Sequence, residues 1–331
     1  MKKILALTLS LIMVMTLFTA CSSSDEKVKT GLAVITSISD KSKDATAEAD
    51  GLAQADSTAV AVLVDSKGVI KNIVIDVVQT KVNFNTAGEI TTDFAQEYVS
   101  KHELGDAYNM KGASAIGKEW FEQANALADY VTGKKLEDVK KIALDGGYPT
   151  DADLTSSVTM NIGEILNAIE KAVNNAQDLG ASANDKLGLG IISNLGKSAN
   201  AGEKDGLAQA YTHYGAITVD SKGKITSSII DASQANVNFS VEGKITNIAE
   251  DIKTKTELGD GYNMKGTSPI GKEWFEQAKA FADYIKGKTV AEVKGIALDG
   301  GYATSEDLTS SVTINISDFI TVVDKAGATA K

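Results

Sequence analysis

The stretch that decides the organisation of this chain is Asp-Leu-Thr-Ser-Ser-Val-Thr at residues 153–159, because it occurs again at residues 307–313. In both places a Gly-Gly-Tyr turn precedes the stretch and an amphipathic helical pattern follows it. The similarity extends far to the N-terminal side of each stretch. The sequence therefore predicts two tandem repeats of one domain, at 30–176 and 187–326, joined by a polar linker at 177–186.

Each repeat begins with strand patterns and continues with helical ones. In the first repeat, β-branched stretches at 59–64 and 69–78 flank an Asp-Ser-Lys-Gly turn, which is typical of a hairpin. Helical patterns follow at residues 114–132, 136–142 and 161–173. Trp120 and its counterpart Trp274 fall on the apolar face of the first helix and are interpreted as core residues. Strands followed by helices predict an α+β fold, an antiparallel sheet with helices packed on one side.

The N-terminus predicts where the protein is located. Two lysines precede an apolar segment at 4–18, which is too short to span a bilayer stably, and Cys21 follows it. This arrangement resembles a bacterial lipoprotein signal. The resemblance implies that residues 1–21 form the signal and that Cys21 carries the lipid. Residues 22–29 would tether the protein to the cell membrane on its extracellular face.

Composition excludes several classes of function. Acidic residues outnumber basic ones 44 to 33, and the net charge of −11 makes nucleic acid an unsuitable partner. All the basic side chains are lysines, so an anion would be held by lysine, hydroxyl or backbone N–H groups. With one cysteine, and with His102 and His213 at unmatched repeat positions, neither an internal disulfide nor a transition-metal site is expected. Both histidines are interpreted as solvated surface residues.

The order of strands, a helix, and then Asp-x-x-Ser-x-x-Thr before an Asn-Ala-containing helix resembles the bacterial FMN-binding domain family. In that family the pattern is Asp-x-x-Ser/Thr-Gly-Ala-Thr, and a flavin transferase joins FMN to the final threonine through a phosphoester bond. The resemblance implies a set of cofactor-binding residues in each repeat, with a nearby tyrosine able to cover the ring. They are Asp153, Ser156, Ser157, Thr159 and Tyr148 in the first repeat, and Asp307, Ser310, Ser311, Thr313 and Tyr302 in the second.

Two positions depart from the family pattern in both repeats. The glycine is replaced by Ser157 and Ser311, and the alanine by Val158 and Val312. Serine lacks the freedom of glycine at positive φ, and valine is bulkier and stiffer than alanine. The segment therefore has an alternative interpretation, as a polar connection whose hydroxyls only cap the helix that follows.

Two functions from different classes remain open. The resemblance implies an electron carrier, with FMN phosphates at the start of the last helix of each repeat. Its partners would be a flavin transferase, a membrane electron donor and an extracellular acceptor. Such a carrier would not be an enzyme alone, because no substrate domain is present. The alternative is a non-redox binding or interaction lipoprotein that has the fold but has lost the cofactor.

Overall fold

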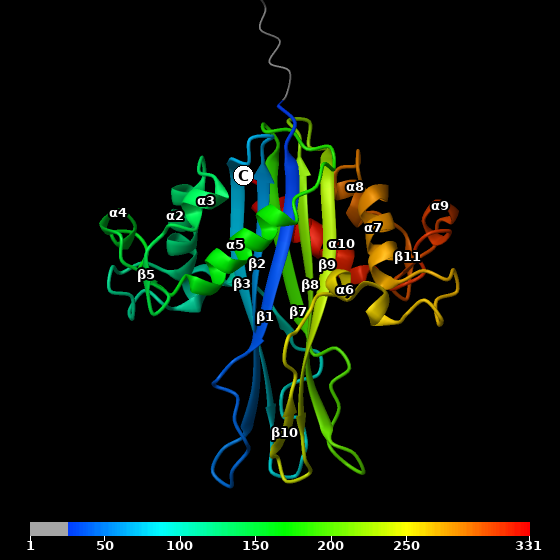
Figure 1. The fold of residues 1–331 in the computed structure, drawn as a ribbon. Coiled ribbons are helices and arrows are strands. Elements are labelled where there is room, and N and C mark those ends of the chain that lie inside the picture. The colour runs from blue at the N-terminus through cyan, green and yellow to red at the C-terminus, as the bar shows by residue number, and fades with distance from the viewer. Residues whose placement is uncertain (1–25) are drawn as a thin grey trace, which may run out of the picture.

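The computed structural model describes residues 26–331, so the signal segment and Cys21 lie outside the described residues. Its antiparallel sheets and its helices confirm the predicted α+β class. The long strands stand side by side at the centre, and the helices cover the two outer sides (Figure 1).

The first half of the chain carries three long strands and then a series of mostly short helices. Its elements are β1 (Lys29–Ile38), β2 (Gly51–Val64), β3 (Ile70–Phe84), β4 (Glu97–Tyr98), α1 (Lys101–Leu104), η1 (Gly105–Tyr108), α2 (Trp120–Val131), α3 (Leu136–Val139), β5 (Leu144–Asp145), β6 (Tyr148–Pro149), α4 (Ala152–Thr155) and α5 (Gly163–Asn174).

The second half has the same succession of long strands and later helices. Its elements are β7 (Lys186–Asn194), β8 (Gly206–Val219), β9 (Ile225–Phe239), β10 (Ile245–Ile248), α6 (Lys255–Leu258), η2 (Gly259–Tyr262), α7 (Trp274–Tyr284), α8 (Val290–Lys294), β11 (Leu298–Asp299), β12 (Tyr302–Ala303), α9 (Glu306–Thr309) and α10 (Ser317–Thr329).

The strands form two main sheets, and the chain crosses between them. One sheet has the order β1-β2-β3, and the other has the order β10-β9-β8-β7-β4. The short strand β4 therefore belongs by sequence to the first half but pairs with the second, through Glu97 and Asn194. The segment predicted as a linker also pairs with the first half, because the backbone of Gln177 bonds to Thr30 of β1.

Both faces of each sheet are buried, largely by apolar side chains, and each face has a different partner. Along β2, Val60 and Val62 point to the core formed with α2 and α5. The residues between them, Ala59, Ala61 and Leu63, point the other way and join a core shared with the second half. From the second half this shared core receives Leu187, Leu189, Ile191, Tyr214 and Ala216, and Ala181 of the connecting segment joins it. The two sheets therefore pack against each other, and each sheet carries its own helices on the outside.

A second contact between the halves lies where the strands extend beyond the helices. The rings of Phe84 and Phe239 stack there, with centroids 4.3 Å apart and planes 11° apart. Both rings are fully buried among alanine, valine and leucine side chains from both halves. The halves are thus joined along most of the length of their strands.

Some predicted element boundaries differ from the observed ones. The helix predicted from residue 114 begins at Trp120, because Gly117 has φ +61° and Glu119 is the N-cap. The hairpin strands are longer than predicted and run from Gly51 to Phe84 around the expected turn. Trp120 is 5% exposed and Trp274 is 3% exposed, which confirms their core role. Among the described residues, no helix is long and apolar enough to cross a membrane.

The last helix of each half lies very close to a glycine of the sheet. A Cβ atom on Gly31 would lie 2.1 Å from the carbonyl oxygen of Ala172 in α5, and one on Gly188 would lie 1.8 Å from that of Ala326 in α10. Neither contact leaves room for a methyl group.

We expect Gly188→Ala to lower the free energy of unfolding by about 1–3 kcal/mol, because α10 must move away from β7. The matched control is Gly261→Ala, at a glycine with no atom near its Cβ position and with alanine at the corresponding place in the first half. Urea unfolding of both variants checks this. Equal effects of the two changes would contradict the close packing.

Candidate functional site

The segment predicted to carry flavin runs from the end of α4 to the start of α5. Leu154 and Val158 are completely buried in the core under α2 and α5, and Leu308 and Val312 are buried in the same way. The valine that replaces the family's alanine is thus a core residue in both halves. Thr159 and Thr313 are half-buried. The helix α5 begins at Gly163, four residues after Thr159, and the side chain of Asn161 accepts the N–H of Gly163.

A buried glutamine accepts hydrogen bonds from the backbone at each threonine. The Oε1 atom of Gln123 accepts the N–H of Thr159 at 2.8 Å and the N–H of Met160 at 3.1 Å. The Thr159 hydroxyl points to the same oxygen at 3.4 Å. Gln277 accepts the N–H of Thr313 at 2.8 Å and its hydroxyl at 3.2 Å. The N–H groups of these two threonines are therefore already bonded within the fold.

The other polar residues of the segment also bond locally. The hydroxyl of Ser156 donates to the carbonyl of Asp153, and that of Ser157 donates to the carbonyl of Leu154. In the second half Ser311 makes the corresponding bond to Leu308. The remaining side chains of the predicted set in this segment, Asp153, Asp307 and Ser310, are exposed.

The predicted tyrosines stand at small hairpins on the outer flanks, where Figure 1 labels β5 and β11. Tyr148 and Tyr302 are each 52% exposed. Gly146 and Gly147 form the turn with φ of +56° and +87°. A Cβ atom on Gly147 would lie 2.4 Å from the amide of Asn161, which donates to the carbonyl of Gly146. The two glycines are thus explained by the turn and by the asparagine packed on it.

A cavity of about 420 Å³ lies between the two halves, and sequence reasoning did not find it. Its apolar floor is formed by Val74 of β3 and by Leu189 and Ile191 of β7. Its polar rim combines residues of α1 and α2 with residues from α10 to the C-terminal end. The rim residues include Asp76, Ser100, His102, Glu103, Asn125, Lys325, Thr329 and Lys331.

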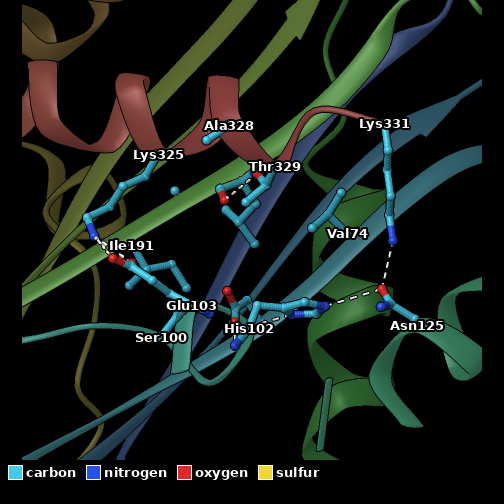
Figure 2. Close-up of a pocket in the computed structure, with 13 residues that line it drawn as sticks. Val74, Ser100, His102, Glu103, Asn125, Ile191, Lys325, Ala328, Thr329 and Lys331 are labelled. Carbon is cyan, nitrogen blue, oxygen red and sulfur yellow. Dashed lines mark hydrogen bonds and ion pairs between the residues drawn. The ribbon is translucent and has the colours of Figure 1, made fainter. Parts of the chain in front are cut away.

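Figure 2 shows how the rim is arranged, with His102 and Lys331 both directed to Asn125. The Oδ1 atom of Asn125 accepts the Lys331 ammonium at 2.7 Å and lies 3.2 Å from His102 Nε2. On the other side of the cavity, Lys325 pairs with Glu103 at 2.5 Å. The charge of Lys325 is thus neutralised, whereas Lys331 has a neutral amide as its partner.

The interpretation of both histidines as solvated surface residues is wrong. The side chain of His102 is 19% exposed and lines the cavity, with Nδ1 3.5 Å from Asp76. His213 is 4% exposed, and burial lowers its pKa to about 3, so its ring is neutral. It packs on Tyr211 and lies 3.2 Å from Asp318. Tertiary packing, which a single sequence does not display, encloses both rings.

A smaller cavity of about 220 Å³ lies at the matching place on the other side of the molecule. It repeats the ion pair across the halves, between Lys171 and Glu257 at 2.5 Å. Thr256 stands where the larger cavity has His102, and Gln177 stands where it has Lys331. The larger cavity therefore has an imidazole and an ammonium group that the smaller one lacks, and Asn125 lines only the larger one. These two differences, His102 against Thr256 and Lys331 against Gln177, were the sequence signal for the site.

The comparisons with known proteins leave the family open. No known protein family matches the chain, and no solved structure matches it. A stretch of 42 residues is 55% identical to part of a chlorophenol reductase from Desulfitobacterium hafniense. This stretch covers 13% of the present chain and 13% of that protein. Among residues 26–331, no group of three or more histidine, cysteine, aspartate or glutamate side chains is placed to hold a metal ion.

We expect Gln123→Ala to lower the free energy of unfolding by about 1–3 kcal/mol, because two N–H groups lose their acceptor. Thr159→Val removes only the long hydroxyl contact and should cost about 0.5 kcal/mol or less. Chemical unfolding of the two variants measures both values. A negligible effect of Gln123→Ala would show that the glutamine does not hold this segment.

Proposed function

We propose that this protein is a non-redox binding lipoprotein whose ligand occupies the 420 Å³ cavity between its two halves. The observation that supports this most is the asymmetry of the cavity pair, since the larger one carries His102 and Lys331. Cavities between domains, with an apolar floor and few polar groups, are common ligand sites. In this proposal Cys21 anchors the protein by its lipid to the extracellular face of the cell membrane.

The chemistry of the cavity favours a small organic anion with a short apolar body. The ammonium of Lys331 has N–H donors for a carboxylate or phenolate beyond its bond to Asn125, and the ring of His102 lies on the same side of the cavity. Val74, Leu189 and Ile191 offer the apolar surface on which the rest of the ligand would lie. Asp76 faces the histidine and Glu103 is paired with Lys325, so neither carboxylate is left to oppose the anion alone.

Two probes suit this pocket: hexanoate, and a chlorophenolate, which the name of the similar reductase suggests. The chain has two histidines, and only His102 lines the cavity. We therefore expect NMR of histidine-labelled protein to show the His102 ring signals moving on titration and those of His213 staying in place. Saturable movement with either probe supports the proposal.

The matched control is the double variant His102→Thr, Lys331→Gln, which places in the larger cavity the residues that the smaller one has at these two positions. Because this variant has no ring signal in the cavity, calorimetry measures its affinity. We expect binding at least tenfold weaker than in the natural chain, which is a loss of about 1.4 kcal/mol. Unchanged affinity of the double variant, or no response of His102 to either probe, would overturn the proposal.

The electron carrier with covalent FMN is the second candidate. The half-exposed state of Thr159 and Thr313 favours it, because each hydroxyl makes only a long bond to its glutamine. Asp153, Ser156, Ser157 and Tyr148, with Asp307, Ser310, Ser311 and Tyr302, would surround the flavin. A flavin transferase, a membrane electron donor and an extracellular acceptor would be its partners. The bonded N–H groups of both threonines give the phosphate less support than the family resemblance implies.

Coexpression with a flavin transferase separates the two candidates. If the binding proposal holds, the denatured protein is colourless and its mass contains no flavin. If the carrier is correct, the denatured protein is yellow, and Thr159→Ala and Thr313→Ala each remove the mass of one flavin.

A further inference from the structure

Two lysines at corresponding positions, Lys101 and Lys255, each lie against aromatic rings at the start of a short helix. The ammonium nitrogen of Lys255 is 4.3 Å from the ring centre of Tyr211, 4.5 Å from that of Tyr262 and 4.9 Å from that of Trp274. That of Lys101 is 4.6 Å from the ring centre of Tyr108 and 5.2 Å from that of Trp120. The first cage thus repeats the second with one ring fewer.

One substitution between the repeats accounts for the difference. The sequence Gly-Leu-Ala-Gln-Ala is followed by Asp56 in the first half and by Tyr211 in the second. Lys255 donates a hydrogen bond to the Tyr211 hydroxyl at 2.5 Å and is only 3% exposed. Tyr211 therefore closes the cage around Lys255, and no ring takes this place beside Lys101.

The open cage leads into a cavity of about 420 Å³ that is separate from the one between the halves. Lys101 lines it together with two tyrosines and with polar residues of β3 and β4. The lining includes Gln79, Lys81, Gln96, Glu97, Tyr98, Tyr108 and Leu104. Lys101 is half-buried, and its ammonium nitrogen lies 4.6 Å from the ring centre of Tyr108, which also lines the cavity, so we infer that the amine is reached from this cavity.

The amines of Lys101 and Lys255 lose their protons more easily in the protein than they would in water. Burial lowers the pKa of Lys101 to about 8, and the charge of Lys41 acts in the same direction, whereas Asp56 opposes the shift. Burial lowers the pKa of Lys255 further, to about 7. Asp76 and Glu164 oppose the shift at Lys101 as well, so burial is its main cause. A desolvated lysine is the kind that attacks carbonyl compounds. The two lysines thus share a tendency to lose the proton and differ in access.

We propose that the amine of Lys101 forms imines with small aldehydes that enter this cavity, and that Tyr211 bars the same reaction at Lys255. The lone pair of the neutral amine attacks the carbonyl carbon and forms a C–N bond. The two hydrogens of the amine leave with the carbonyl oxygen as water, and a C=N bond remains. No electrons are gained or lost in this step. The tyrosine rings give an aromatic aldehyde apolar surface to lie on.

Benzaldehyde with cyanoborohydride as hydride donor tests this on the full chain, since reduction of the imine fixes a benzyl group to the amine. Mass spectrometry of peptides gives the rate at each lysine. At pH 8 about half of the Lys101 amine is neutral. We therefore expect it to react about tenfold faster, or more, than Lys67 and Lys222, two exposed lysines in turns. Lys255 should stay unmodified. A rate at Lys101 equal to that of the turn lysines would overturn the proposal.

Exchanging the residues that differ between the cages provides the matched variants. Asp56→Tyr should close the first cage and slow Lys101 at least tenfold, whereas Asp56→Ala, which removes the charge but adds no ring, should leave it reactive. Tyr211→Asp should make Lys255 reactive. Circular dichroism and thermal melting show whether each variant is folded. If folded Asp56→Tyr reacts as fast as the natural chain, the ring does not control access and the proposal is wrong.

Discussion

The rest of the structure depends on one constraint: both faces of each central sheet are largely apolar, so each sheet needs two partners to bury them. Helices such as α2 and α5 cover one face, and the sheet of the other half covers the second. Burial of apolar surface is the main favourable term in folding, and neither half can complete it without the other. The cavity pair and the ion pairs Lys325–Glu103 and Lys171–Glu257 exist because the halves are packed in this way.

The two halves share their framework and differ at many positions, and some of the polar differences define the candidate sites. His102 corresponds to Thr256, and Asp56 corresponds to Tyr211. A third difference shows how the fold accommodates such changes. Thr58 donates to Glu164 at 2.5 Å, and at the same place in the second half His213 lies 3.2 Å from Asp318. The order of the elements is thus alike in the two halves, whereas side chains at the cavities differ.

The sequence was sufficient to predict elements and core residues whose signals are local. The hairpin around residues 65–68, the helix that contains Trp120 and the α+β class follow from apolar periodicity and turn residues. The packing of sheet on sheet was missed, although the unbroken apolar run at 59–64 indicates a strand buried on both faces. Gln123 was missed because its partners lie 36 residues away and only the fold brings them together. His102 was misread as a surface residue for the same reason.

The shared core is tested most directly by unfolding the full chain in denaturant while each half is followed separately. The chain has two tryptophans, Trp120 in the first half and Trp274 in the second, and both are buried. In the variants Trp274→Phe and Trp120→Phe, fluorescence reports on one half at a time. For each variant, the unfolding transition seen by fluorescence is compared with the one seen by circular dichroism. The account predicts that the two transitions coincide in both variants. If one half unfolds while the other stays folded, the halves do not depend on a common core and the account is contradicted.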